Sequence, residues 1–288
     1  MRQGGGVSDV RRVAVWRDGA AVEVPADRPV VTAFDAGLGR GDGVFESVAV
    51  TDGATPHLAD HLARLTRSAG LLDLADPGGQ VWHALTDSAL HGWDAATEGV
   101  LRLFLTRGLG DGSTPTALAL LSPVPPETVR QREHGIAVVS LTLGLPADVR
   151  AHAPWLLGGA KTLSYAVNMA AIRHAQRLGA DDAVFTSVEG QVFEGPTSTV
   201  VWATHGELRT APLDAGILPG TTQARLFARA AVAGWPTAVV PATVDDLHAA
   251  DAVWLLSGVR GAARVHTLDG VPRGDAGLSA RVKELLAG

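Results

Sequence analysis

The chain has 288 residues, 46% of them apolar and 19% charged, and its net charge at pH 7 is −6; this composition predicts a globular protein and argues against a disordered or nucleic-acid-binding one. Cysteine is absent, which excludes disulfides, thiolate metal ligands and a cysteine nucleophile. No apolar run reaches the roughly 18 residues of a membrane span, and the first residues lack the apolar core of a secretion signal, so we expect a cytoplasmic protein without membrane or nucleic-acid partners.

The first half of the chain predicts a small α+β domain. Its start, residues 1–9, is rich in glycine, and we expect it to be flexible. Two segments alternate like β-hairpins and turn at Asp18-Gly19 and Asp52-Gly53. The predicted elements are, in chain order, hairpins 11–24 and 41–58, helices 58–72 and 78–91, and strands 99–108 and 116–124.

The second half predicts a further, larger domain. It follows residues 122–135, which contain three prolines and a run of charged residues, a composition that suits an interdomain linker. We therefore expect an α+β protein with domains 1–122 and 133–288 and a linker over 123–132. The predicted elements of the second half are strand 136–144, helix 162–178, hairpin 183–203 around Glu189-Gly190, helix 221–233, strands 237–241 and 252–256, and a C-terminal helix.

Lys161 is one of only two lysines among the 24 basic residues, and it follows Gly158-Gly159-Ala160. Arginine cannot lose its proton in a protein, whereas a desolvated lysine can. A neutral amine is what imine formation with a carbonyl requires. No acidic residue lies within ten positions on either side of Lys161. The local sequence alone nevertheless favours the plainer interpretation, a lysine before a helix that points into solvent.

Other polar positions suit either chemistry or ordinary structure. Glu194 ends a predicted strand, where it could hold a heteroaromatic nitrogen protonated or simply face solvent. Thr221 and Thr222 open a predicted helix after a Pro-Gly turn, which suits a phosphate site as well as an ordinary threonine N-cap. Arg64 lies on the polar face of its helix and Arg107 precedes a glycine-rich loop. Their candidate ligands are a phosphate and a substrate carboxylate, and solvent or a plain turn is the alternative.

The sequence predicts no metal site and no nucleotide-binding loop. His57 and His61 are four residues apart, but no acidic partner pattern accompanies them. Residues 37–43, GLGRGDG, lack the G-x-G-x-x-G spacing, and strand-like residues follow where a helix should begin. No Ser-His-Asp order stands out.

The order of the motifs is more informative than any one of them. Along the chain stand GDGVFES, HLARLTRSA, AKTLSYAVNMAAIRHAQRLGADDAVF, GQVFEGPTSTVVW, GILPGTT and ARVHTLDG. Together they resemble the class IV (fold type IV) pyridoxal-phosphate enzymes, over about residues 30 to 270. This family includes branched-chain and D-amino-acid aminotransferases and aminodeoxychorismate lyases. The resemblance implies a small α+β domain, a larger pseudo-barrel domain that binds pyridoxal 5′-phosphate (PLP), a site between them and a homodimer.

The resemblance also implies a role for each matching position. Lys161 would bind the aldehyde of the cofactor covalently and act as the catalytic base. Glu194 would pair with the pyridine nitrogen, and Tyr165, the only tyrosine, would donate to the phenolic oxygen. The other implied cofactor contacts are Arg64, Leu218, Thr221, Thr222, Ser257 and Gly258. The candidate substrate-binding residues are Arg107 and Arg40.

Within the family, RGDGVFE and KTLSYAVNMA are similar to sequences usually interpreted as aminodeoxychorismate lyases. Arg40 stands where many transaminases place an aromatic residue before Gly-Asp-Gly. Residues 108–115 lack the Arg-x-His of D-amino-acid enzymes, and also the second arginine that is frequent in the lyases. We predict a 4-amino-4-deoxychorismate lyase that eliminates pyruvate and yields 4-aminobenzoate for folate synthesis.

Two alternatives remain open. The first is an aminotransferase that acts on D-amino acids or branched-chain amino acids with 2-oxoglutarate. The second, more distant, is a protein that kept the fold for binding only. Lys161, Tyr165 and Glu194 occur together, which argues against the second alternative because packing alone would not require all three.

Overall fold

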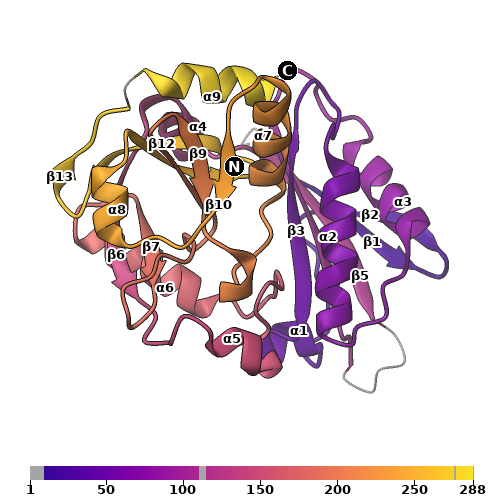
Figure 1. The fold of residues 1–288 in the computed structure, drawn as a ribbon. Helices are drawn as coiled ribbons and strands as arrows, with labels where there is room; N and C mark the ends of the chain where they lie inside the picture. Colours follow the sequence, from indigo (N-terminus) through magenta and orange to yellow (C-terminus); the bar gives the residue numbers. More distant parts are fainter. Residues whose placement is uncertain (1–9, 110–114, 276, 288) are drawn as a thin grey trace, which may run out of the picture. The chain divides into compact units, whose positions relative to one another are not determined.

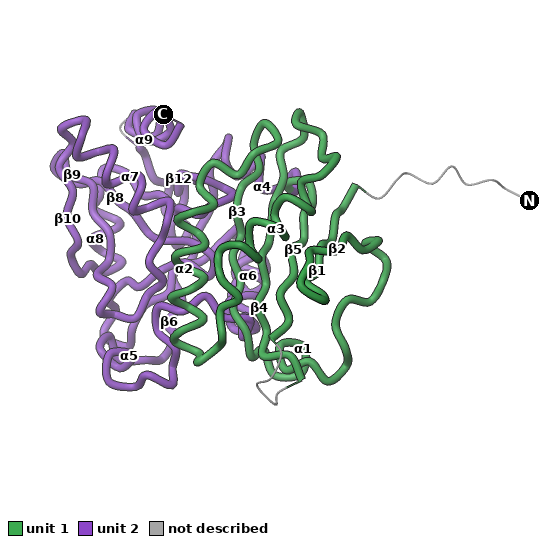
Figure 2. The backbone as a smooth tube through the Cα atoms, turned by 90° about the vertical axis from the view of Figure 1, so that its right-hand side faces the viewer, with its two compact units in different colours: residues 1–124 green, residues 125–288 purple. Residues whose placement is uncertain are grey.

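The computed structural model describes residues 10–109, 115–275 and 277–287. The chain divides into two compact units, Met1–Val124 (unit 1) and Pro125–Gly288 (unit 2), which Figure 2 shows in different colours. The dividing point lies inside the segment 123–132 for which the sequence predicts a linker. Most of that segment is helical, because Pro126 stands in the first turn of helix α4 (Pro126–His134), where its fixed φ favours the helix.

Unit 1 is built on a five-stranded antiparallel sheet with the strand order β2-β1-β5-β4-β3 (Figure 1). Helix α2 packs against β3, and helix α3 packs against β1, β2 and β5. Within the described residues, the elements are strands β1 (Arg12–Arg17), β2 (Ala20–Val24), β3 (Gly43–Val50), β4 (Gly99–Thr106) and β5 (Thr116–Pro123), and helices α1 (Ala36–Arg40), α2 (Leu58–Leu71) and α3 (Gly79–Leu90). Apart from the second strand of the hairpin 41–58, these positions confirm the predicted helices and strands of the first half to within a few residues.

The predicted hairpin at Asp18-Gly19 is confirmed. Asp18 and Gly19 have φ angles of 52° and 79°, and such a left-handed pair is what a type I′ hairpin turn requires. The turn joins β1 to β2, which pair antiparallel from Val13 with Val24 to Arg17 with Ala20.

The predicted hairpin over 41–58 is wrong beyond its turn. After Asp52-Gly53 the chain forms a single bridge, between Thr51 and Ala54. Pro56 has no N–H with which to continue a ladder, and helix α2 begins two residues later. Strand β3 pairs along its whole length with β4 instead.

Unit 2 contains an eight-stranded mixed sheet with the order β10-β9-β8-β11-β12-β6-β7, and β13 pairs with β12. Strand β6 runs parallel to β7 and β12, and β9 runs parallel to β10. In the described residues the strands are β6 (Ile136–Thr142), β7 (Asp182–Thr186), β8 (Thr199–Thr204), β9 (Glu207–Thr210), β10 (Thr237–Val239), β11 (Ala252–Ser257), β12 (Gly261–Leu268) and β13 (Val271–Pro272). The helices besides α4 are α5 (Val149–His152), α6 (Ala166–Arg177), α7 (Thr221–Val232), α8 (Val244–Ala249) and α9 (Leu278–Ala287), with 3-10 turns η1 (Pro154–Leu156) and η2 (Leu213–Ala215).

The central strands of unit 2 are buried on both faces. Trp202 of β8 and Leu255 of β11 belong to one apolar cluster, whereas their neighbours Val201 and Trp254 belong to another. Successive side chains of a strand point to opposite faces, so the two clusters lie on opposite sides of the sheet. Helices α7 and α9 contribute to the second cluster through buried Leu226 and other apolar residues. A strand that is covered on both faces has a nearly continuous run of apolar residues in its sequence, as β8 and β11 have.

Two predictions for unit 2 need correction. The segment 183–203 is not one hairpin, because only a short turn around Glu189-Gly190 folds back: the amides of Phe193 and Phe185 donate across it to Phe185 and Glu194. The chain then turns at 195–198, so β8 pairs with β9 and β11 and is not adjacent to β7. The predicted helix 162–178 begins only at Ala166.

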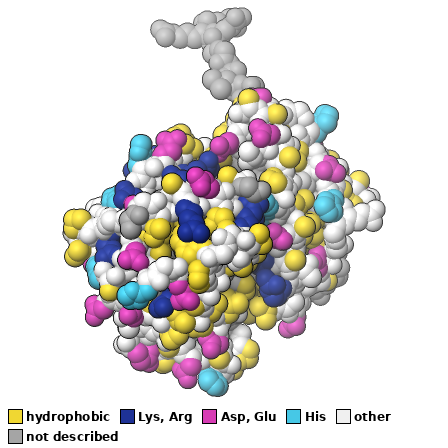
Figure 3. Space-filling model, turned by 45° about the horizontal axis from the view of Figure 1, so that its top comes forward, with side chains coloured by type: hydrophobic (Ala, Val, Ile, Leu, Met, Phe, Trp, Pro, Cys, Tyr) yellow, Lys and Arg dark blue, Asp and Glu magenta, His cyan; other side chains and the backbone are white. Residues whose placement is uncertain are grey.

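The visible surface carries charges of both signs. On the face shown in Figure 3, Lys and Arg side chains are interspersed with Asp and Glu side chains and with apolar residues. No helix among the described residues is both long and apolar enough to cross a bilayer.

Candidate active site

Lys161 lies just before α6 and is only 9% exposed, so the interpretation of a solvent-facing lysine is wrong. Its Nζ lies 5.5 Å from the centre of the Tyr165 ring. The loop before it approaches another loop closely, since a Cβ on Gly158 would lie 3.1 Å from Cα of Gly216. The amide of Gly159, at φ +79°, donates to the carbonyl of Gly216. The small residues before Lys161 are therefore required by a backbone contact that places the lysine.

Tyr165 stands at the N-cap position of α6. Its hydroxyl donates to the carbonyl of Pro196 at 3.0 Å, and Nδ2 of Asn168 donates to the same oxygen at 2.7 Å. The first turn of α6 is thereby tied to the turn that comes after Glu194. Asn168 was not identified from the sequence; its spacing of three residues from Tyr165, which places both on one helix face, is the signal that could have found it.

The Glu194 carboxylate is held between two neighbours. Its Oε2 accepts a hydrogen bond from the amide of Leu218 at 3.0 Å, and its Oε1 lies 3.9 Å from Nη1 of Arg150. The side chain is 20% exposed, so Glu194 is neither fully solvated nor fully buried. Leu218 contacts this carboxylate through its backbone amide, and such a contact cannot be predicted from the residue type.

The start of α7 carries polar groups suited to an anion. Thr221 is the first helical residue, and the N-cap is Gly220, without a side-chain cap, so the ordinary threonine N-cap is not formed. A Cβ on Gly220 would lie 2.2 Å from Oγ1 of Thr199, which explains the glycine. Among the described residues, the buried hydroxyls of Thr222 and Ser198 have no hydrogen-bond partner. Such orphaned hydroxyls are rare, and at the start of a helix they are available to a group that is not part of the chain.

The turn after β11 is anchored from several sides. Ser257 ends β11, and Gly258 begins the turn that leads to β12. Arg260, in the same turn, donates from Nη2 to Asp182 at 2.8 Å and from Nη1 to Gln131 at 3.0 Å. Arg132 donates to the carbonyl of Val259 at 3.0 Å. Helix α4 and strand β7 therefore hold the turn in which the sequence predicts cofactor contacts.

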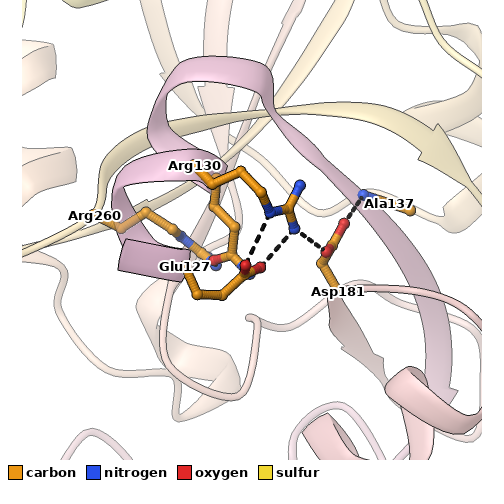
Figure 4. Close-up of polar contacts among 6 residues, drawn as sticks. Glu127, Arg130, Ala137, Asp181 and Arg260 are labelled. Atoms are coloured by element: carbon orange, nitrogen blue, oxygen red, sulfur yellow. Dashed lines mark hydrogen bonds and ion pairs between the residues drawn. The ribbon is translucent and has the colours of Figure 1, made fainter. Parts of the chain in front are cut away.

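A second ionic contact joins the same elements at the surface. Figure 4 shows Arg130 of α4 between Glu127 and Asp181, with Arg260 nearby. Arg130 lies 2.7 Å from Asp181, whose other oxygen accepts from the amide of Ala137 at 2.8 Å. The ion pair therefore also holds helix α4 against the residue that comes just before β7.

In unit 1, Arg64 is buried in an ionic cluster and does not face solvent. Its Nε and Nη2 donate to the two oxygens of Glu46 at 2.7 and 2.8 Å, and Nδ1 of His61 lies 2.7 Å from Oε2. Burial alone raises the pKa of Glu46, but hydrogen bonds from Arg64 and His61, with their charges, lower it to about 2. Sequence reasoning missed Glu46, although a carboxylate in the alternating strand GVFESVAV was a signal.

The two candidate substrate-binding arginines lie in different surroundings. Nε of Arg107 donates to Asp42 at 2.7 Å, and Nη2 donates to the carbonyl of Leu72 at 2.6 Å. The hydrogen bond with Asp42 raises the pKa of Arg107. Arg40 ends α1 and is exposed. The loop considered with Arg107, residues 108–115, lies partly outside the described residues.

The donors of unit 2 fit pyridoxal phosphate. A buried lysine amine suits an aldehyde, the Glu194 carboxylate suits a protonated ring nitrogen, and a helix start with an orphaned hydroxyl suits a phosphate. Among the described residues, no group of three or more His, Asp or Glu side chains could hold a metal ion.

The comparisons with known proteins agree with this fit. The model of the family "Amino-transferase class IV" matches residues 43–268, and the chain belongs to this family. It is 46% identical over 251 residues to the bifunctional aminodeoxychorismate lyase / D-amino acid transaminase of Mycobacterium tuberculosis, covering 84% of this chain and 87% of that protein.

Solved structures show the same similarity. A hypothetical aminotransferase from Mycobacterium tuberculosis, in its PLP-bound form, has a TM-score of 0.91 and 42% identity, over 96% of this chain and 97% of that one. A fold IV-transaminase from Curtobacterium pusillum has a TM-score of 0.89 and 39% identity, over 96% and 98%. The predicted family, the α+β fold of type IV and the cofactor PLP are confirmed, and the protein is a PLP-dependent aminotransferase or lyase.

Proposed function

We propose that this protein is a 4-amino-4-deoxychorismate lyase, which releases pyruvate and 4-aminobenzoate for folate synthesis. The observation that carries the proposal is the burial of Lys161 in the same unit as Glu194 and the start of α7. The similarity to a relative whose name includes this lyase supports the choice of reaction. The proposal includes a homodimer and a cytoplasmic location, for which the family resemblance and the composition are the support.

Each part of the cofactor has a proposed contact among the residues described above. Lys161 would bond covalently to the aldehyde, Glu194 would pair with the ring nitrogen, and Tyr165 would donate to the phenolic oxygen. Leu218 would lie against the ring. The phosphate and the rest of the cofactor would be held by Arg64, Thr221, Thr222, Ser257 and Gly258. The N–H groups at the start of α7 favour a negative charge in any case.

The chemistry of the lyase needs a neutral amine and an anionic carboxylate. When bound, PLP supplies an electron sink for the negative charge at the substrate's α-carbon. Lys161, which is largely buried, would take the proton from that carbon as general base. Glu194 would stay ionised and hold a proton on the ring nitrogen. Since aminodeoxychorismate carries its enolpyruvyl group β to this carbon, elimination would then yield an aromatic product.

Arg107 and Arg40 are the proposed contacts for substrate carboxylates. Arg107 is already paired with Asp42, and this pair would fix the guanidinium in one orientation. Arg40 is exposed at the end of α1, and its exposure leaves it accessible to a substrate.

D-amino-acid transamination is the second candidate, because the same relative carries that activity in its name. Both reactions begin with removal of the proton from the carbon that carries the substrate's amino group. They differ after that step, because transamination needs an oxo acid to complete its cycle and elimination does not.

The deciding experiment supplies aminodeoxychorismate alone and, separately, a D-amino acid with 2-oxoglutarate. We expect prompt release of 4-aminobenzoate and pyruvate without any oxo acid. Efficient amino transfer with no 4-aminobenzoate would contradict the lyase proposal and favour the transaminase. The Lys161→Ala protein should catalyse neither reaction.

The attachment site can be tested independently of any substrate. Borohydride reduction of the PLP-loaded protein, followed by peptide mapping, should place the cofactor on Lys161. Lys283, on an exposed position of α9, is the internal control because it is the other lysine of the chain. A label on Lys283 or on the amino terminus, with none on Lys161, would refute the assignment.

A further inference from the structure

Arg150, in the short helix α5, reaches the carboxylate of Glu194 from a distant part of the sequence. Its Nη1 lies 3.9 Å from Oε1 of Glu194 and donates to the carbonyl of Gly216 at 3.0 Å. Its guanidinium carbon lies 5.7 Å from the centre of the Phe193 ring. The side chain is 19% exposed, so the contact is partly shielded from water.

The surrounding backbone is shaped to admit this arginine. Gly216 has φ +71°, and a Cβ there would lie 2.4 Å from Cβ and 2.6 Å from Cδ of Arg150. A Cβ on Gly158 would lie 3.1 Å from Cβ of Arg150. Larger residues at either glycine would displace the arginine stem. Both glycines also belong to the loops that lead to Lys161 and to Leu218, so one side chain contacts three segments of the candidate site.

We propose that Arg150 is a positioning residue that keeps Glu194 ionised and oriented toward the ring nitrogen of PLP. A cation about 4 Å from a carboxylate favours the ionised form, and the amide of Leu218 fixes the other oxygen. Only the anionic form can hold a proton on the ring nitrogen. The inference rests on the proposed role of Glu194 and adds the residue through which that role is maintained.

A purely structural role makes a different prediction. If Arg150 only tethers α5 to Gly216, lysine and glutamine, both shorter hydrogen-bond donors, should weaken PLP binding to a similar extent. If its charge acts on Glu194, lysine would preserve part of the effect and glutamine would not. Comparison of Arg150→Lys with Arg150→Gln therefore separates the effect of charge from that of tethering. With two variants, the test does not depend on the folding of a single one.

The test titrates each cofactor-free protein with PLP and records its affinity and the visible absorption band, whose position depends on protonation of the ring nitrogen. We expect Arg150→Gln to weaken PLP binding roughly two- to fivefold, the range of a weak ion pair, and to shift the band. Arg150→Lys should recover part of both. Equal behaviour of the two variants, or a Gln variant that matches the wild type, would overturn the proposal.

A double-mutant cycle with Glu194→Gln tests whether Arg150 acts through Glu194. In the Glu194→Gln background, Arg150→Gln should change the affinity less than about twofold. The same loss as in the wild type would mean that Arg150 acts independently, which overturns the proposal. If Glu194→Gln itself binds PLP normally, the roles of both residues are refuted. These measurements use no substrate, so they test the role of Arg150 whether or not the lyase assay succeeds.

Discussion

Nη2 of Arg260 donates to Oδ2 of Asp182 at 2.8 Å, and both side chains are less than one-tenth exposed. Asp182→Asn would leave the arginine charge buried without a counter-charge. Breaking a buried ion pair on one side costs about 3–5 kcal/mol. We expect the free energy of unfolding to fall by that amount, measured by denaturant titration at neutral pH.

The adjacent Asp181 is the matched control. It pairs with Arg130, whose side chain is 44% exposed, and exposed pairs contribute about 1 kcal/mol or less. Asn at position 181 retains an oxygen that can accept from the amide of Ala137, the partner of the present carboxylate. If Asp181→Asn and Asp182→Asn lost equal stability, burial would not be the source of the difference.

Glu46 makes the stability of unit 1 dependent on pH. Its pKa is lowered from 4.5 to about 2, so the folded protein favours the ionised form. That stabilisation is fully present above about pH 4.5 and is lost as the pH falls toward 2. The lowered pKa corresponds to roughly 3 kcal/mol at neutral pH.

The comparison of wild type with Glu46→Gln tests this prediction. The variant should be less stable at neutral pH, and the difference in unfolding free energy should shrink as the pH falls from about 4.5 to about 2.5. Urea titrations across that range measure it. A difference that stays constant with pH would show that charge at position 46 does not stabilise the fold.

The hydroxyl of Thr222 should serve a ligand and not the fold. It is buried and has no partner among the described residues, so Thr222→Val should leave the melting temperature of the cofactor-free protein unchanged or raise it. The same change should weaken PLP binding if the hydroxyl bonds the phosphate, roughly tenfold or more for one lost hydrogen bond to a charged group.

Thr86 is the control for this experiment, because its buried hydroxyl in α3 also lacks a partner within the described ranges. Thr86→Val should leave PLP affinity unchanged. If Thr222→Val also left the affinity unchanged, the phosphate assignment at the start of α7 would be wrong.

The sequence predicted what depends on local pattern. Lys161 was identified by its residue type and by its place in a motif order, and the turn at Asp18-Gly19 by a dipeptide that favours left-handed φ. Most helices and strands could be assigned from apolar spacing. The family and the cofactor were indicated by the motifs and by their order along the chain.

The features that the sequence could not predict depend on pairing across long separations. Arg260 and Asp182 are 78 residues apart, and Arg64 and Glu46 are 18 apart. Periodicity shows which face of an element is buried but not which element covers it. For the same reason β3 was assigned to a local hairpin, whereas β4, about 50 residues later, provides the longer set of backbone hydrogen bonds and is the partner observed.

Gly216 offers a test of whether the position of Arg150 matters to the site. Alanine there must adopt φ +71° and would also meet the arginine stem at 2.4 Å. Gly234 has φ +67° with nothing within 4 Å of an added Cβ, so Gly234→Ala incurs the backbone strain alone, about 1–2 kcal/mol. Gly216→Ala should lose more unfolding free energy than Gly234→Ala. It should also weaken PLP binding severalfold, whereas the Gly234→Ala protein should bind PLP as the wild type does. Equal losses of stability together with equal PLP affinities in the two variants would show that crowding of Arg150 has no effect on the cofactor site.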